Sequence, residues 1–207
     1  PGLGGERVQV VGPPAVDAHT VALCIRKPSV QHTTLTTLGR APLVEAKPSS
    51  DVGSSTSSGG IFGRKLRDTS LLDPVDEELL SLQRSHRLEA FLRLAVQHRR
   101  TIVVAGRTGA GKTTLMRALI EEIPTDERLI TIEDAAELFM PRHANALHLF
   151  YSRGDQGAAK VSASSLLEAC LRLRPERILL AEMRGEEAFA FLRLAASGHP
   201  GSLTSVH

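Results

Sequence analysis

Thr101-Ile-Val-Val-Ala-Gly-Arg-Thr-Gly-Ala-Gly-Lys-Thr-Thr114 joins an apolar run to a glycine-rich loop that ends in a lysine and two threonines. Glycines at these spacings let backbone N–H groups converge on a phosphate, while Lys112 reaches the β- and γ-oxygens. The hydroxyl of Thr113 completes the Mg²⁺ shell. A helix from about residue 113 to 122 would direct its positive dipole end at the same anion. The stretch therefore predicts a strand, a phosphate-binding loop and a helix.

This loop is the predicted binding site for a nucleotide phosphate, with Thr113 as the metal-binding residue. The alternative is a glycine-rich turn that holds only a bystander anion. The predicted nucleotide contacts are Gly106, Arg107, Thr108, Gly109, Ala110, Gly111, Lys112, Thr113 and Thr114.

The composition is that of an ordinary soluble protein with enough apolar residues to bury a core. The chain has 207 residues, is 42% hydrophobic and carries a formal net charge of +2. Aromatic residues make up 3% and Trp is absent, so few platforms exist for stacking bases and we expect no direct nucleic-acid binding. Cys24 and Cys170 lie far apart, which favours buried reduced thiols over a disulfide or a zinc site.

No apolar run has the length needed to cross a bilayer, and the first residues lack the pattern of a signal peptide. We therefore expect any membrane association to be peripheral and mediated by partners. Because the chain starts at Pro1 and stops at His207 directly after a strand-like run, we expect it to be a fragment lacking both ends.

The pattern along the chain indicates two domains joined by a linker. Short β-like runs at 6–11 and 20–25 predict a partial, β-containing N-terminal domain over residues 1–46. Residues 47–60 are rich in serine and glycine and predict a flexible linker. Residues 61–207 then form the phosphate-loop domain.

Within that domain, apolar spacing predicts an α/β fold with a mostly parallel sheet covered by helices on both faces. Residues 75–97 have helical spacing with a turn near Ser85. Further helical stretches are expected at 164–173 and 186–196, and further strands at 128–132, 177–181 and 202–206. Residues 141–159, which contain His143 and His148, are expected to be a surface loop.

In open α/β sheets the ligand lies beyond the carboxyl ends of the strands, which directs attention to Glu133, Glu182 and His207. Glu182 is the candidate that orients the attacking water, although it could instead cap the following helix or pair with Arg184. His207 alone could equally be an ordinary satisfied polar residue.

Glu133 and Asp134, with Glu137 nearby, could hold Mg²⁺ through its waters, or Asp134 could cap the following turn. A basic cluster of Arg172, Arg174 and Arg177 could be solvated or could supply an arginine finger to a neighbouring subunit.

Four ordered motifs over most of residues 61–207 make the sequence resemble the traffic ATPases of bacterial secretion, in the type IV secretion and conjugation branch. They are Gly106 to Thr114, the acidic box Thr131-Ile-Glu-Asp-Ala-Ala-Glu-Leu138, the run from Cys170 to Gly185, and the histidine box Ser197-Gly-His-Pro-Gly-Ser-Leu-Thr-Ser-Val-His207. The resemblance implies a RecA-like core, an N-terminal domain, and a hexameric ring that binds ATP between domains or subunits.

Carried over by position, the resemblance implies catalytic roles for Lys112, Glu133, Glu182 and His207, the last as a γ-phosphate sensor. It also implies that Arg26 closes over the nucleotide. Ala181 stands where many phosphate-loop enzymes have an acidic metal ligand, so Mg²⁺ is expected to depend on Thr113 and on water-mediated contacts. The C-terminal helices expected in the ring are absent from the sequence.

The expected function is an ATP-hydrolysing motor at the cytoplasmic face of a bacterial inner membrane, with inner-membrane secretion components as partners. The alternatives are a small-molecule kinase and a non-catalytic module whose assembly is gated by ATP. Type II secretion and pilus ATPases share the same energy-coupling residues, and the sequence does not identify the transported substrate.

Overall fold

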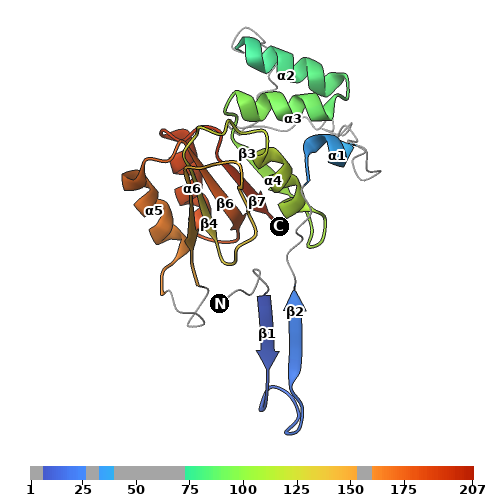
Figure 1. Cartoon of the computed structure of the whole chain (residues 1–207), viewed down its shortest axis with the longest axis vertical. Helices are drawn as coiled ribbons and strands as arrows, with labels where there is room; N and C mark the ends of the chain where they lie inside the picture. The colour runs from blue at the N-terminus through green and yellow to red at the C-terminus, as the bar shows by residue number, and fades with distance from the viewer. Residues whose placement is uncertain (1–6, 27–32, 40–72, 153–159) are drawn as a thin grey trace, which may run out of the picture.

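The computed structural model describes residues 7–26, 33–39, 73–152 and 160–207. Its centre is a five-stranded parallel sheet, several strands of which are labelled in Figure 1, and the strand order is β3-β7-β6-β4-β5. The strands of this sheet are β3 (Ile102–Ala105), β4 (Leu129–Glu133), β5 (Ala146–Phe150), β6 (Arg177–Met183) and β7 (Leu203–Val206).

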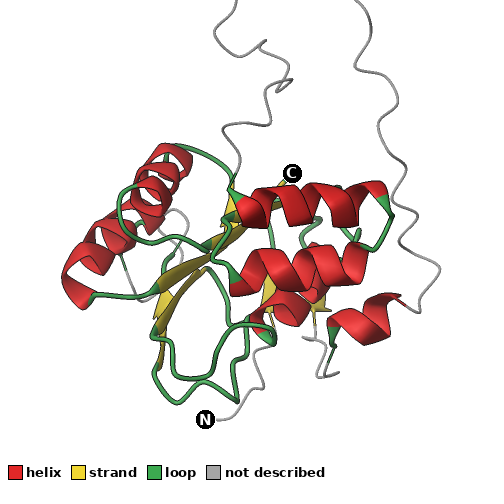
Figure 2. Cartoon of the chain, turned by 90° about the horizontal axis from the view of Figure 1, so that it is seen from above, coloured by secondary structure: helices red, strands yellow, loops and turns green. Residues whose placement is uncertain are grey.

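Helices cover both faces of the sheet, as Figure 2 shows. The helices of the described residues are α1 (Leu35–Gly39), α2 (Pro74–Arg84), α3 (Leu88–Gln97), α4 (Lys112–Ile120), α5 (Ala163–Leu173) and α6 (Glu187–Ala196), of which α4 packs on one face of the sheet and α5 and α6 on the other. Alternate strand residues face opposite layers: Leu179 packs in one core with Leu119 of α4, while Ile178 packs in the other with Leu167 of α5 and Phe191 of α6. This arrangement confirms the predicted α/β fold.

The predicted break in the helical stretch is confirmed near Ser85, where α2 ends. Asp73 begins α2 by accepting a hydrogen bond from the Asp76 N–H at 2.8 Å, and Pro74 occupies the first turn, where its missing N–H costs nothing. Within the described ranges, no helix combines the length and the apolar content needed to cross a membrane.

The prediction of a surface loop over residues 141–159 is wrong for its central part, because β5 adds an edge strand there. Leu147 and Leu149 point toward the core beneath α5, while His148 and Phe150 are exposed on the opposite face. This alternation is the usual signal of a half-buried strand.

The N-terminal segment forms a separate antiparallel hairpin of β1 (Arg7–Val11) and β2 (Ala22–Arg26). One face of the hairpin is apolar and at least half exposed, and it consists of Val8, Val10, Leu23 and Ile25. Leu35 of α1, within the predicted N-terminal domain, packs in the core with Val96 of α3. The predicted linker at 47–60 lies outside the described residues.

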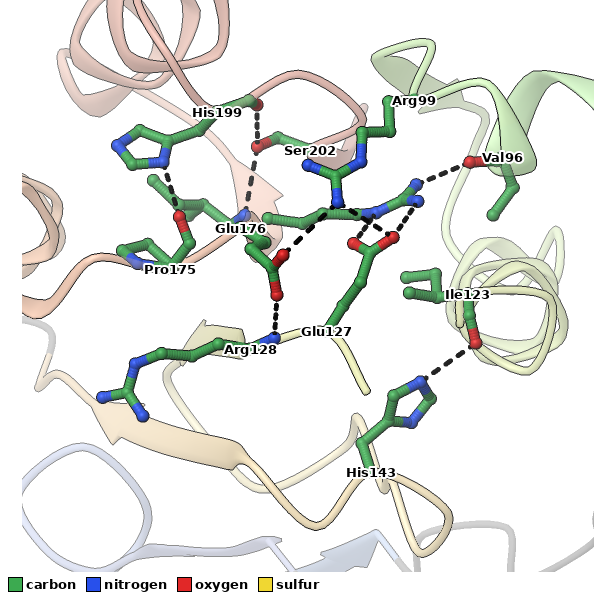
Figure 3. A network of polar contacts seen from close by, with 12 residues as sticks. Val96, Arg99, Ile123, Glu127, Arg128, His143, Pro175, Glu176, His199 and Ser202 are labelled. Carbon is green, nitrogen blue, oxygen red and sulfur yellow. Dashed lines mark hydrogen bonds and ion pairs between the residues drawn. The ribbon is translucent and has the colours of Figure 1, made fainter. Parts of the chain in front are cut away.

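A buried ion pair fixes the amino ends of the strands (Figure 3). The Arg177 side chain is 0% exposed and binds Glu127 through Nε at 2.7 Å and Nη2 at 2.9 Å. Its Nη1 donates to the Val96 carbonyl at 2.7 Å, which ties the end of α3 to the sheet. Gly201 has φ +78°, and a Cβ there would lie 2.7 Å from Arg177 Nη1. Arg177 is therefore a structural residue, and the suggestion that it could be an arginine finger is wrong.

Candidate functional site

The candidate site lies along the carboxyl edge of four neighbouring strands. Because β3, β7, β6 and β4 are adjacent in the sheet, the phosphate loop, His207, Glu182 and Glu133 follow one another along this edge. The sheet thus brings together the strand-end residues that the sequence singled out.

The phosphate loop leaves β3 and begins α4 with two glycines in left-handed backbone conformations. Gly109 has φ +78° and Gly111, the residue that begins the helix, has φ +88°. A side chain at either position would be strained, since L-residues rarely adopt these angles. Residues 107–111 are all exposed, so the loop is open to solvent. The geometry is that of an anion-binding loop at a helix amino end.

Lys112 crosses the loop. Its Nζ donates to the Gly106 carbonyl at 2.6 Å and lies 3.4 Å from the Arg107 carbonyl. Thr114 is half-buried in the first turn of α4. The ammonium group therefore lies at the loop, where it could donate to a phosphate oxygen in place of the Gly106 carbonyl.

The carboxylate of Glu182 reaches the site because β6 contains a β-bulge. The register of β6 with β7 runs from Leu180 opposite Thr204 to Met183 opposite Val206, so two residues of β6 face one residue of β7. The Ser205 hydroxyl donates to the Ala181 carbonyl at 2.7 Å within this bulge. Bulges redirect side chains and are common beside active sites. The sequence pattern does not reveal this feature.

Two basic side chains contact Glu182. Arg184 Nη2 donates to its Oε2, and His207 Nε2 lies 2.7 Å from its Oε1. Burial acts to raise the pKa of Glu182, but the hydrogen bond from Arg184 and the charges of Arg184, His207 and Lys112 outweigh it, so the pKa lies below its usual value. Glu182 is therefore a carboxylate at neutral pH and can accept a hydrogen bond.

Among the residues that the structure describes, Glu182 Oε1 has an ion-pair contact but no hydrogen bond. Oε1 is shielded from solvent and accepts no hydrogen bond within the described part of the chain, because the close approach of His207 lacks hydrogen-bond geometry. Of the two alternatives considered for Glu182, the structure shows the pairing with Arg184 and not a cap on α6, because Glu187 is the side chain that accepts from the Arg184 and Gly185 N–H groups ahead of that helix.

Glu133 is buried and its carboxylate is bound to protein groups. Its Oε2 accepts from the N–H groups of Glu137 at 2.7 Å and Leu138 at 2.8 Å. Its Oε1 lies 3.4 Å from His148 Nδ1. The acidic side chain that reaches the phosphate loop is instead Glu137, whose Oε2 accepts from the Thr113 hydroxyl at 3.3 Å.

The oxygen atoms of Thr113 and Glu137 are of the type that Mg²⁺ prefers. No group of three or more His, Cys, Asp or Glu side chains in the described ranges could hold a metal by itself. Magnesium bound mainly by phosphate oxygens and water would need only these few protein ligands. The residues present therefore fit a Mg²⁺–nucleotide.

Arg26 is the last residue of β2 and pairs with Arg7 across the hairpin. Its action on a nucleotide stays a prediction. In contrast to the expected buried thiols, Cys24 in the same hairpin is exposed, whereas Cys170 is buried.

The sequence matches one protein family over most of its length. The model of the type II/IV secretion system protein family matches residues 70–207. The match covers the phosphate loop and the other three strand ends of the site.

Similar curated proteins come from type IV secretion systems. The chain is 47% identical over 205 residues to the type IV secretion system protein VirB11 of Brucella suis, covering 98% of this chain and 52% of that protein. It is 46% identical over 206 residues to the type IV secretion system protein PtlH of Bordetella pertussis, covering 99% of this chain and 55% of that protein. The chain thus spans about half the length of the curated relatives it matches.

Solved structures show the same fold. The crystal structure of the Brucella suis VirB11 ATPase in complex with sulphate matches with a TM-score of 0.62 and 47% identity, covering 99% of this chain and 55% of that one. The crystal structure of the pilus retraction motor PilT with bound ADP matches with a TM-score of 0.54 and 22% identity, covering 99% of this chain and 48% of that one. The predicted RecA-like phosphate-loop fold is confirmed.

Proposed function

The chain belongs to the type II/IV secretion system protein family, and we propose that it is the ATP-hydrolysing core of a motor that powers type IV secretion or conjugation. The observation that carries the proposal is the Glu182 carboxylate at the strand end beside the phosphate loop, where Arg184, His207 and Lys112 keep it ionised against the effect of burial. A kinase or a binding module needs a phosphate loop as well, but neither needs a carboxylate prepared to orient water.

The residues of this site have different roles in binding and hydrolysis. The backbone N–H groups of residues 107–111 and the Lys112 ammonium bind the phosphates of ATP. Thr113 and Glu137 would hold Mg²⁺, which supplies charge neutralisation at the β- and γ-phosphates. Glu182 accepts a hydrogen bond from the attacking water and so orients it. His207, next to Glu182, senses the γ-phosphate by exchanging its carboxylate contact for a phosphate oxygen.

The motor acts by closing around nucleotide. A bound γ-phosphate draws an N-terminal domain and Arg26 onto the core, and release of phosphate reopens them. We propose a homo-oligomer, in hexameric form, at the cytoplasmic face of a bacterial inner membrane, with the membrane components of the secretion system as partners. The identity of the relatives as type IV secretion proteins supports this branch over type II secretion and pilus motors.

Release of inorganic phosphate from ATP and Mg²⁺, with no acceptor molecule added, tests the proposal. We expect phosphate release by the full chain and its loss in the Lys112→Ala variant. Phosphate transfer that occurs only with an added acceptor would identify a kinase. Tight nucleotide binding with assembly and no release would identify an ATP-gated module.

A further inference from the structure

We propose that His148, on the edge strand β5, and the buried Glu133 are positioning residues that together hold Glu137 against Thr113, so that Glu133 acts through Glu137 rather than on the nucleotide. This inference rests on the proposed function for its nucleotide-dependent consequence. Its structural part concerns the protein alone.

The first step is the attachment of the acidic segment to Glu133. The Glu133 side chain is 0% exposed, and its Oε2 accepts two successive backbone hydrogen bonds, from Glu137 and Leu138. A carboxylate that binds two N–H groups of one segment fixes the path of that backbone. Glu133 cannot also present this oxygen to a metal or a phosphate.

The second step is the attachment of the same segment to α4. Arg117 Nε donates to the Glu137 carbonyl at 2.7 Å, and its guanidinium lies 5.4 Å from the centre of the Phe139 ring. Leu138 between them is only 1% exposed and packs in the core. Both the N–H and the carbonyl of Glu137 are thus bound, which directs its side chain toward Thr113.

The third step is the support of Glu133 by the edge strand. His148 pairs with Thr131 in the register of β4 and β5, and its Nδ1 lies 3.0 Å from the Thr131 hydroxyl and 3.4 Å from Glu133 Oε1. Removal of the imidazole would leave a buried carboxylate oxygen with one hydrogen-bonding group fewer, which such oxygens tolerate poorly. The imidazole also stacks on Phe150, with ring centres 6.5 Å apart. A side chain at the rim of the sheet therefore helps to orient a carboxylate at the nucleotide site.

The experiment compares His148→Ala with His148→Asn in the full chain. The Asn side chain can place an N–H donor near the position of Nδ1, whereas Ala has none. His86→Asn is the matched control, because His86 is exposed in the turn after α2 and remote in sequence from the acidic segment. Thermal unfolding confirms that each variant is folded.

Two measurements follow. Hydrogen exchange without nucleotide reports the amides of Glu137 and Leu138, and we expect faster exchange in His148→Ala and recovery in His148→Asn. Calorimetry with AMP-PNP reports binding with Mg²⁺ and with EDTA. We expect His148→Ala to weaken the Mg²⁺-dependent binding by about five-fold, the effect of one lost hydrogen bond, with little change in EDTA.

Unchanged exchange at Glu137 and Leu138 in His148→Ala would overturn the proposal, whether or not nucleotide binds. Equal losses of affinity with Mg²⁺ and with EDTA would also overturn it, because they would indicate a general structural defect. If hydrogen exchange at Glu137 and Leu138 is faster in His148→Ala but the wild-type chain binds no nucleotide, then the support of Glu133 by His148 is established and the proposed ATPase function fails.

Discussion

His207 Nε2 lies 2.7 Å from Glu182 Oε1, which joins the carboxyl ends of the adjacent strands β7 and β6. The contact depends on the bulge that turns Glu182 toward the site. It places the His207 ring against the carboxylate proposed to orient water. Nucleotide hydrolysis would therefore respond to small changes around these two residues.

Arg184→Gln is expected to raise the pKa of Glu182. Burial already acts to raise this pKa, and the Arg184 hydrogen bond and charge are the largest contributions that lower it. The acid limb of the pH profile of kcat/KM should therefore move to higher pH. At neutral pH, where the carboxylate stays ionised, kcat/KM itself should change less. Arg84→Gln, at an exposed position at the end of α2, is the control. An acid limb that does not move would show that a group other than Glu182 controls it.

Ser205→Ala is expected to lower kcat more than it changes KM. The Ser205 hydroxyl donates to the Ala181 carbonyl inside the bulge, and its loss removes about 1 kcal/mol of hydrogen bonding and frees the bulge to shift. Steady-state kinetics give kcat and KM for this variant and for the control variant Ser81→Ala, which changes an exposed residue. A change confined to KM would argue against the bulge as the feature that aims Glu182.

Arg177→Met is expected to destabilise the fold by about 3 kcal/mol, because it leaves the buried Glu127 carboxylate with the longer Arg99 contact, at 3.4 Å, in place of the two Arg177 hydrogen bonds. Urea unfolding provides the free energy, and adding Glu127→Gln should recover part of the loss. A single variant as stable as the wild type would contradict the structural role of the pair.

The same ion pair predicts a pH dependence of stability. Burial acts to raise the pKa of Glu127, but the Arg177 hydrogen bond and the charges of Arg177, Arg99 and His143 together outweigh burial, so the pKa lies below its ordinary value of 4.5. A depressed folded-state pKa contributes stability above the unfolded pKa, and this contribution is lost as pH falls through the folded pKa. Urea unfolding at acidic pH should show this loss in the wild type and a weaker loss in Glu127→Gln.

The sequence predicted the parts of the site that depend on residue type. The phosphate loop is recognisable because Gly109 and Gly111 adopt angles that other residues avoid, and Lys112 and Thr113 follow at fixed spacing. The strand ends were predictable because parallel strands end at one edge of a sheet.

The remaining features depend on contacts between distant segments. The bulge at Glu182 results from the register of β6 against β7. Strand β5 was not predicted, because the polar residues around it favoured a loop. The burial of Arg177 depends on Glu127, fifty residues away in sequence. The alternation of Leu147 and Leu149 was the signal that could have identified β5.

The two cysteines should differ sharply in reactivity. Cys24 is exposed, whereas burial raises the pKa of the Cys170 thiol to about 11. Since the thiolate is the reactive form, a thiol reagent should modify Cys24 quickly and Cys170 only after unfolding. Mass spectrometry of the native and denatured chain provides the measurement. Rapid modification of both residues in the native chain would contradict the packing of α5 on the sheet.

The role of Glu182 in orienting water is tested most directly by measuring both the phosphate release and the ATP affinity of the Glu182→Gln variant. The variant keeps the shape of the side chain and removes the charge that orients water. We expect ATP to bind about as tightly as in the wild type and phosphate release to fall by about 10²–10⁴-fold, the usual contribution of a general base. Phosphate release at the wild-type rate would contradict the proposed role of Glu182.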